Sequence, residues 1–186
     1  FTVSFEDKRL VPYQPLDLKE PADLVAAIRH RRGGDLINLD RMLLHSAPFA
    51  KGWNAFLGEV RNHLALDPKL RELAMCGVAV MNQAEYEFIH HAPVFLAAGG
   101  SKEQVAALRH MGQEAMPLDL FSAIEKDAIE LTIQMTQSVQ VDADLIKRLQ
   151  DALGSQCLVE LVGVIATYNM VSRFLVALNV TPEESH

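Results

Sequence analysis

Cysteine is scarce in this sequence. Its 186 residues include two cysteines, Cys76 and Cys157, which lie far apart and form no Cys-x-x-Cys pair. Because Cys76 lies in an apolar run, we interpret both as free core thiols in a reducing compartment rather than as a disulfide. The first residues show no signal-peptide pattern, so we expect a cytoplasmic protein.

Positive charge and long uninterrupted apolar runs are also lacking. The formal net charge is −7, which argues against a nucleic-acid backbone as the partner. The most apolar stretch, residues 157–178, is interrupted by Glu160, Asn169 and Arg173, and it therefore predicts a core helix rather than a membrane span. Since 49% of the residues are hydrophobic, disorder is excluded as well.

No segment of useful length alternates apolar and polar residues with a period of two, so the sequence predicts an all-α fold. Apolar residues instead recur at helical spacing, between helix-starting and helix-ending residues. The expected helices cover residues 21–32, 41–45, 48–64, 68–81, 83–98, 101–111, 122–138, 142–154 and 155–178. We expect residues 1–20 to form an extended arm, residues 21–180 a single domain, and residues 181–186 a polar tail.

Four positions carry further structural expectations. Asp40 is expected to cap the helix at 41–45, and Asn82 to end one helix and cap the next. Phe56 is expected to face the core. Gly163, inside the last helix, indicates close helix packing there.

Carboxylates and imidazoles gather in residues 68–100, inside an otherwise hydrophobic region. Glu87 and His91 are four residues apart, so they share one face of a helix. Glu72 lies on the preceding helix, and a tight break at Asn82 would fold the two helices into a hairpin that brings these side chains together. Burial and a neighbouring carboxylate raise the pKa of a carboxyl group, and a carboxylate favours protonated histidine. Such a set transfers protons near neutral pH, so Glu72, Glu87 and His91 are the predicted catalytic residues.

Two plainer interpretations stay open. Glu87 and His91 also fit an exposed helix surface, whereas Glu72, in an apolar run, is costly to bury unless it shares a polar network with His91. Metal binding by these side chains together with His90 is a further option. A Glu-x-x-His pair needs a second such pair from another helix to form a di-iron site, and because none is found we predict no metal.

Four stretches of the chain carry a family resemblance. They are Arg41–Trp53, Leu70–Ala74, Glu85–His91 and Glu160–Phe174, which together span roughly residues 35–180. They resemble the carboxymuconolactone decarboxylase family, which has the alkyl hydroperoxidase D-like (AhpD-like) fold. The resemblance implies an AhpD-like helical bundle, a homo-oligomer (dimer, trimer or hexamer), and no metal or organic cofactor.

The peroxidase branch of that superfamily carries a glutamate followed by a Cys-x-x-Cys-x-x-x-His motif. Laid on this chain, the glutamate falls on Glu72 and the histidine on His91, but the two cysteine positions fall on Ala84 and Glu87. No thiolate is therefore placed to attack a peroxide, and no second thiol to recycle it.

The decarboxylase branch releases CO₂ from a lactone. That reaction needs a cation to hold the carboxylate, an acid to protonate the carbon, and exclusion of water. On this resemblance Glu87 and His91 are expected to transfer the proton, and Glu72 to orient His91.

The substrate's carboxylate is expected to be held by His90, Arg41 or Arg173, where an arginine would make a two-pronged contact. Tyr86 shares a helix face with His90, and this pair is either a substrate contact or a structural or interface element. Tyr168, in the last helix, faces either the same cavity or a subunit contact.

Three hypotheses follow. The first is a cofactor-independent lyase of aromatic catabolism that transfers protons on a small carboxylated or lactone-like substrate. The second is an antioxidant, alkylhydroperoxidase-type activity, and the third is a non-catalytic ligand-binding or scaffold protein. The first requires that Glu72 and His91 lie within hydrogen-bond reach, directly or through one water.

Overall fold

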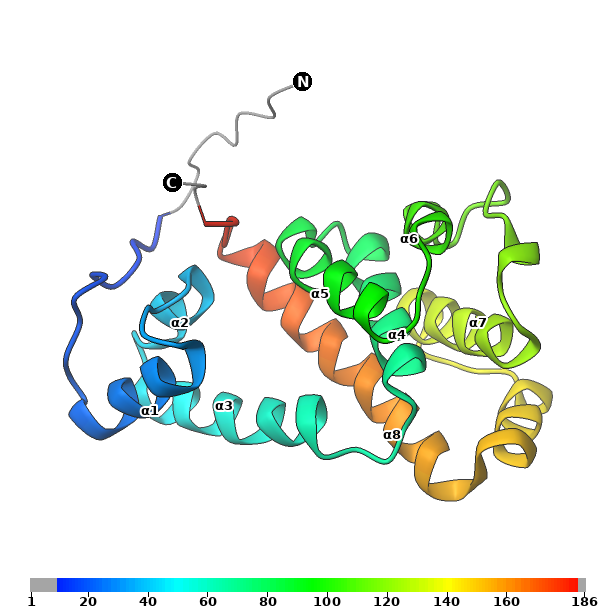
Figure 1. The fold of residues 1–186 in the computed structure, drawn as a ribbon, viewed down its shortest axis with the longest axis horizontal. Coiled ribbons are helices and arrows are strands. Elements are labelled where there is room, and N and C mark those ends of the chain that lie inside the picture. Colours follow the sequence, from blue (N-terminus) through cyan, green and yellow to red (C-terminus); the bar gives the residue numbers. More distant parts are fainter. Residues whose placement is uncertain (1–9, 184–186) are drawn as a thin grey trace. The chain divides into compact units, whose positions relative to one another are not determined.

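The computed structural model describes residues 10–183 and shows a helical protein (Figure 1). Its elements are α1 (Ala22–Arg32), α2 (Asn38–Leu43), α3 (Ala47–Asn62), α4 (Pro68–Met81), α5 (Glu85–Ala97), α6 (Lys102–Leu108), the 3₁₀ helix η1 (Leu118–Leu120), α7 (Ala123–Ser138) and α8 (Ala143–Ala177). The described residues form no strand, so the predicted all-α fold is confirmed.

Several helix ends lie where the sequence predicts them. Ser101 caps α6 and Ser122 caps α7, and each forms a capping box with the side chain three residues later, Gln104 and Glu125. The long helix α8 is broken at Gly154, where φ is 75° and ψ is 170°. The two helices expected on either side of this glycine are therefore both present.

Two expected caps are wrong. Asp40 lies inside α2, where its carboxylate accepts a hydrogen bond from the Ile37 amide (3.2 Å) and pairs with Arg32 (2.9 Å). Asn82 ends α4 as expected, but α5 begins after Ala84 with no side-chain cap. Asp40 and Asn82 each bond to a side chain of another helix, and the local sequence spacing does not reveal such a partner.

Two expectations about packing are also wrong. Phe56 is 52% exposed, because the buried positions of α3 are Ala50, Trp53, Leu57 and Val60, and Phe56 lies about 100° away from Leu57. An ideal Cβ built on Gly163 meets nothing within 4 Å. No atom of the described residues therefore packs closely against this glycine.

The described residues divide into two compact units, residues 10–63 with 175–183, and residues 64–174. In the first unit, the described part of the C-terminal segment bonds to α2: the Asn38 amide donates to Glu183 (2.8 Å), and the Asn38 side chain donates to the Thr181 carbonyl (3.0 Å). The described part of the predicted arm, residues 10–20, contains no helix, and residues 1–9 and 184–186 lie outside the described range.

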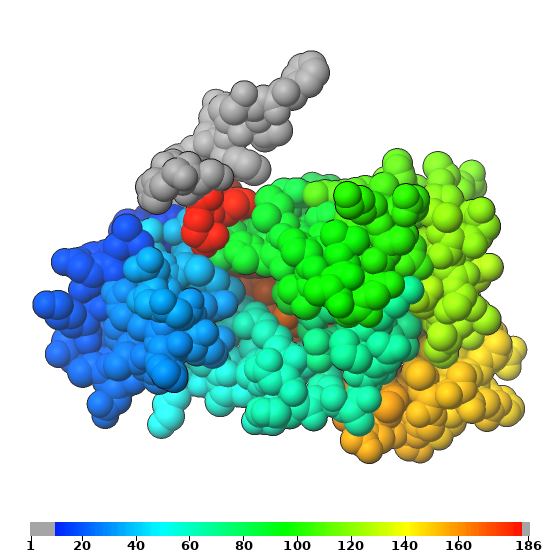
Figure 2. Space-filling view, in the orientation of Figure 1, coloured from blue at the N-terminus to red at the C-terminus, as the bar shows by residue number. Residues whose placement is uncertain are grey.

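Helix α4 is the core of the second unit, where it contacts α5, α6 and α7. Asp67 caps its start by accepting from the Lys69 amide (2.8 Å), and Pro68 follows as the first helical residue. Residues 72–79 are all buried, so α4 is covered on every side and not on one face alone. In the space-filling view, the residues that follow α4, coloured green, form much of this unit's visible surface (Figure 2).

A three-residue turn, residues 82–84, joins α4 to α5. Gln83 in this turn has a positive φ of 56°, which lets the chain reverse at once. The Asn82 side chain donates to Asn169 (3.0 Å) and to Ser172 (2.7 Å), both on α8. The predicted hairpin is therefore present, and α8 holds its turn in place.

Helix α8 is long and apolar enough to cross a membrane by length and composition alone. In its most apolar stretch 44% of the residues are buried inside the protein, including Leu161, Val164 and Ile165. Core helices of soluble proteins meet the same criteria, and we interpret α8 as one of them.

Candidate functional site

The hairpin of α4 and α5 brings Glu72 and His91 into direct contact. Glu72 is 2% exposed, and its Oε2 lies 2.7 Å from Nδ1 of His91. A carboxylate accepts and does not donate, so Nδ1 of His91 carries the hydrogen of this bond. The distance condition set by the sequence is met without a bridging water. With Nδ1 bound to Glu72, Nε2 is the ring nitrogen through which His91 can exchange a proton.

Arg71 also contacts the Glu72 carboxylate. Its Nε lies 3.3 Å from Oε1 of Glu72, the oxygen that does not contact His91. Sequence reasoning missed this residue, because adjacent positions on a helix do not face each other. The long arginine side chain overcomes that separation by folding back on its neighbour.

Glu87 is buried as well, with 2% exposure, one turn before His91 on α5. The interpretation of Glu87 as part of an exposed helix surface is therefore wrong. Its charge acts on the Cys76 thiol, as does the charge of Glu72, so both carboxylates lie near this α4 thiol. Glu72, Glu87 and Cys76 thus share one buried region.

Burial is the largest cause that raises the pKa of the Cys76 thiol far above its ordinary value, and the negative charges of Glu72 and Glu87 raise it further. Cys76 therefore stays a neutral thiol near neutral pH, as expected of a core residue, and it does not supply a nucleophilic thiolate. Cys157 is half-buried, and both cysteines are free, as predicted.

The ring of Tyr168 lies edge-on to the His91 imidazole. The ring centroids are 4.9 Å apart with an interplanar angle of 87°, and Tyr168 is completely buried in α8. His91 is therefore in contact with α4 through Glu72 and with α8 through Tyr168. These contacts restrict the orientation of its ring.

Tyr86 and His90 form a separate pair on α5. Their rings stack with centroids 4.3 Å apart, and Nδ1 of His90 lies 2.7 Å from the Tyr86 carbonyl oxygen. The predicted pairing at helical spacing is present. These contacts are local to one helix and fit a structural role as well as a substrate contact.

The two arginines predicted to hold a carboxylate make other contacts. Arg41, in the first compact unit, donates from Nε to the Gln14 carbonyl (2.6 Å) and from Nη1 to Asn38 (3.1 Å). Arg173, in the second, donates to the Asn169 carbonyl (3.0 Å) and side chain (2.6 Å). Each guanidinium is thus engaged by acceptors of its own unit.

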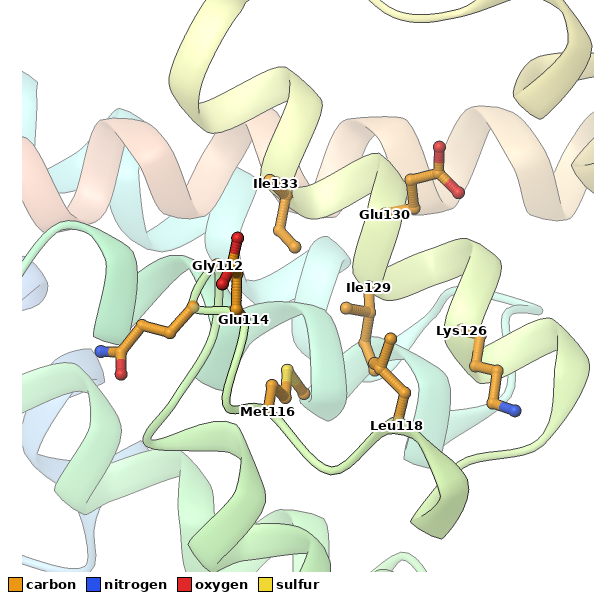
Figure 3. Close-up of a pocket in the computed structure, with 9 residues that line it drawn as sticks. Gly112, Glu114, Met116, Leu118, Lys126, Ile129, Glu130 and Ile133 are labelled. Atoms are coloured by element: carbon orange, nitrogen blue, oxygen red, sulfur yellow. The ribbon is translucent and has the colours of Figure 1, made fainter.

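Two further kinds of ligand site bear on the function, a metal site and a cavity. Among the described residues, no three His, Cys, Asp or Glu side chains are grouped to hold a metal ion. A cavity of about 420 Å³ lies between α7 and the segment before η1, with Met116, Leu118, Ile129 and Ile133 as its apolar lining (Figure 3). None of the predicted site residues lines this cavity.

Comparison with known proteins identifies the fold. Residues 47–116, which include the α4–α5 hairpin, match the sequence model of the carboxymuconolactone decarboxylase family. No curated protein sequence matches the chain. Solved structures do, although at low sequence identity.

Three of these structures are similar over almost their whole length. An uncharacterized peroxidase-related protein from Silicibacter sp. TM1040 has a TM-score of 0.77 at 14% identity, covering 98% of this chain and 96% of that one. A peroxidase-related protein with an alkylhydroperoxidase AhpD core, from Ralstonia eutropha JMP134, has a TM-score of 0.78 at 12% identity, covering 97% and 95%. The debrominase Bmp8, solved with 2,3,4-tribromopyrrole, has a TM-score of 0.75 at 14% identity, covering 94% of each chain.

The shared fold and the match over the α4–α5 hairpin agree with the family resemblance of the sequence. At positions 84 and 87, where the peroxidase branch carries its cysteines, this chain has Ala84 and Glu87. Residues 47–116 thus match the carboxymuconolactone decarboxylase family, the fold is AhpD-like, and the sequence lacks the Cys-x-x-Cys pair.

Proposed function

We propose that this protein is a cofactor-independent enzyme that transfers protons on a small carboxylated or lactone-like substrate, in the manner of a decarboxylase. The observation that carries the proposal is the buried contact of 2.7 Å between Glu72 Oε2 and His91 Nδ1. A carboxylate on Nδ1 orients the imidazole and stabilises its protonated form, as general acid–base catalysis requires.

Each residue has a definite part in the proposed step. When CO₂ leaves, the electron pair of the broken carbon–carbon bond stays on the substrate, and His91 delivers a proton from Nε2 to that carbon. Glu72 holds Nδ1 and balances the charge of the imidazolium. Glu87, buried one turn away on the same helix, is the second carboxyl group near His91 and the second candidate for proton transfer.

A thiol peroxidase is the second candidate, since similar structures are described as peroxidase-related. The site does not favour it. The two cysteine positions are Ala84 and Glu87, and the buried Cys76 has a raised pKa. Peroxide reduction with a thiol donor that is lost in Cys76→Ser would restore this candidate. A binding protein without catalysis is the third candidate.

The decisive experiment follows the ultraviolet absorbance of γ-carboxymuconolactone with the pure protein and no added metal. We expect turnover by the parent protein, none by His91→Ala, and a loss of about 100-fold or more in kcat for Glu72→Gln. His63→Ala is the matched control, because the His63 side chain is 65% exposed at the end of α3 and pairs with Glu59, one turn earlier.

If neither the parent nor the control variant turns over the lactone, the decarboxylase proposal fails for this substrate. If His91→Ala is as active as His63→Ala, the assignment of His91 is wrong. We further propose that the protein acts as a homo-oligomer in the cytoplasm, as the family resemblance implies.

A further inference from the structure

Arg71 has hydrogen-bonding capacity that the protein does not use. Its side chain is only 12% exposed, and its single side-chain bond is the one from Nε to Glu72. Nη1 and Nη2 make no hydrogen bond or ion pair with any residue in the range 10–183. Neither atom is among the buried side-chain atoms that lack a partner in the described part of the chain, so both reach solvent. A guanidinium is always charged and has five N–H donors, so these donors are available to an acceptor that comes from outside.

Arg71 and His91 lie on the two oxygens of one carboxylate. Arg71 contacts Oε1 of Glu72, and His91 contacts Oε2. The Glu72 side chain is 3% exposed, whereas those of Arg71 and His91 are 12% and 13% exposed. The carboxylate therefore lies deepest, and the two nitrogen-bearing groups flank it nearer the surface.

We propose that Nη1 and Nη2 of Arg71 bind the carboxylate of the substrate and so place the adjacent carbon beside His91. A guanidinium binds a carboxylate through two parallel N–H···O bonds, which fixes orientation as well as position. This assignment rests on the proposed function. It gives Arg71 the part that the sequence suggested for Arg41, Arg173 or His90, each of which is engaged locally.

Ligand binding tests the assignment without any need for turnover. Isothermal titration would compare benzoate with benzamide, its uncharged isostere, at constant ionic strength. We expect the parent protein to bind benzoate at least tenfold more tightly than benzamide. Arg71→Gln should lose at least tenfold in benzoate affinity and none in benzamide affinity, and Arg71→Lys should keep part of the preference because it keeps the charge.

Arg148→Gln is the matched control, since Arg148 is exposed and pairs with Asp127 and Glu130. The assignment is overturned if benzoate binds no more tightly than benzamide, or if Arg71→Gln binds benzoate like the control. Circular dichroism checks that each variant is folded, and Arg71→Lys keeps the test valid if Arg71→Gln is not. If the protein prefers benzoate through Arg71 but does not turn over the lactone, only the proposed reaction is rejected. If it turns over the lactone without this preference for benzoate, only the role of Arg71 is rejected.

Discussion

The chemistry of this hairpin depends on which side chains share the buried carboxylate of Glu72. His91 contacts one oxygen and Arg71 the other, and the burial of the Glu72 carboxylate makes each contact stronger than it would be in water. Removing one partner of a buried charge pair typically costs about 3–5 kcal/mol, because the remaining charge is left uncompensated. The conservative variant Glu72→Gln is therefore the better probe of function than Glu72→Ala.

The raised pKa of the Cys76 thiol predicts how the stability of the protein depends on pH. The folded state raises the pKa of this thiol through burial and through the charges of Glu72 and Glu87. Below the unfolded pKa of about 8.5, both the folded and the unfolded chain keep the thiol proton, and the free energy of unfolding is not reduced. Above that pH the unfolded chain releases this proton while the folded chain keeps it, so the free energy of unfolding falls as the pH rises. The slope is at most about 1.4 kcal/mol per pH unit.

Urea unfolding between pH 7 and about 10.5 measures this effect. We expect the free energy of unfolding to fall more steeply above pH 8.5 in the parent protein than in Cys76→Ala. Cys157→Ala is the control, because it also removes one thiol but keeps Cys76, and it should show the parent's slope. Equal slopes in the parent and Cys76→Ala would show that the thiol is not shielded as the structure indicates.

At the scale of the element, the α4–α5 hairpin is defined by its two ends. The turn at 82–84 is held to α8 through Asn82, and α5 ends where Gly99 adopts a φ of 101°. Gly100 follows, and a Cβ at this position would lie 2.3 Å from the ring of Phe95, which is completely buried. The Phe95 ring thus leaves no room for a side chain at position 100.

Two glycine substitutions test this packing with opposite signs. Gly100→Ala should lower the free energy of unfolding by about 1–3 kcal/mol, because the buried Phe95 ring has no room to move. Gly163→Ala should raise it by about 0.5–1 kcal/mol, since the helix interior favours alanine and the added methyl meets nothing within 4 Å. Urea unfolding of the two variants measures both. Destabilisation by Gly163→Ala would show that this glycine packs against a second molecule.

At the scale of the whole molecule, the fold is shared with proteins of very different sequence. Structures at 12–14% identity superpose with TM-scores of 0.75–0.78, yet this chain has Ala84 and Glu87 where the peroxidase branch has cysteines. A fold determines the positions that side chains can occupy, and the identity of those side chains determines which reaction is possible. Peroxidase activity therefore does not follow from the similarity.

The predicted homo-oligomer is testable at this scale. Large apolar side chains stay exposed on the helices, among them Ile89 (44%) on α5 and Val159 (69%) on α8, and a subunit contact would cover such groups. We expect light scattering coupled to size-exclusion chromatography to give two, three or six times the chain mass of 20.6 kDa at micromolar concentration. A mass of one chain would reject the oligomer.

The sequence by itself determined the helical class, most helix ends and the hairpin that joins Glu72 to His91. These are local properties: apolar spacing sets the buried stripe of a helix, and serine, proline and glycine set its ends through hydrogen bonds and φ angles within a few residues. The resemblance of the hairpin to a known family added the expected fold and the positions of the missing cysteines.

Only the tertiary structure decided which side chains contact one another across the fold. The contact of Arg71 with Glu72, the bond of Asn82 to α8, the pairing of Asp40 with Arg32 and the exposure of Phe56 all depend on side-chain rotamers and on elements distant in the chain. Sequence spacing gives the direction of a side chain from its own helix but not what lies opposite it. That is why the sequence predicted that His91 transfers protons, while the contact of Arg71 with Glu72 emerged only from the packed structure.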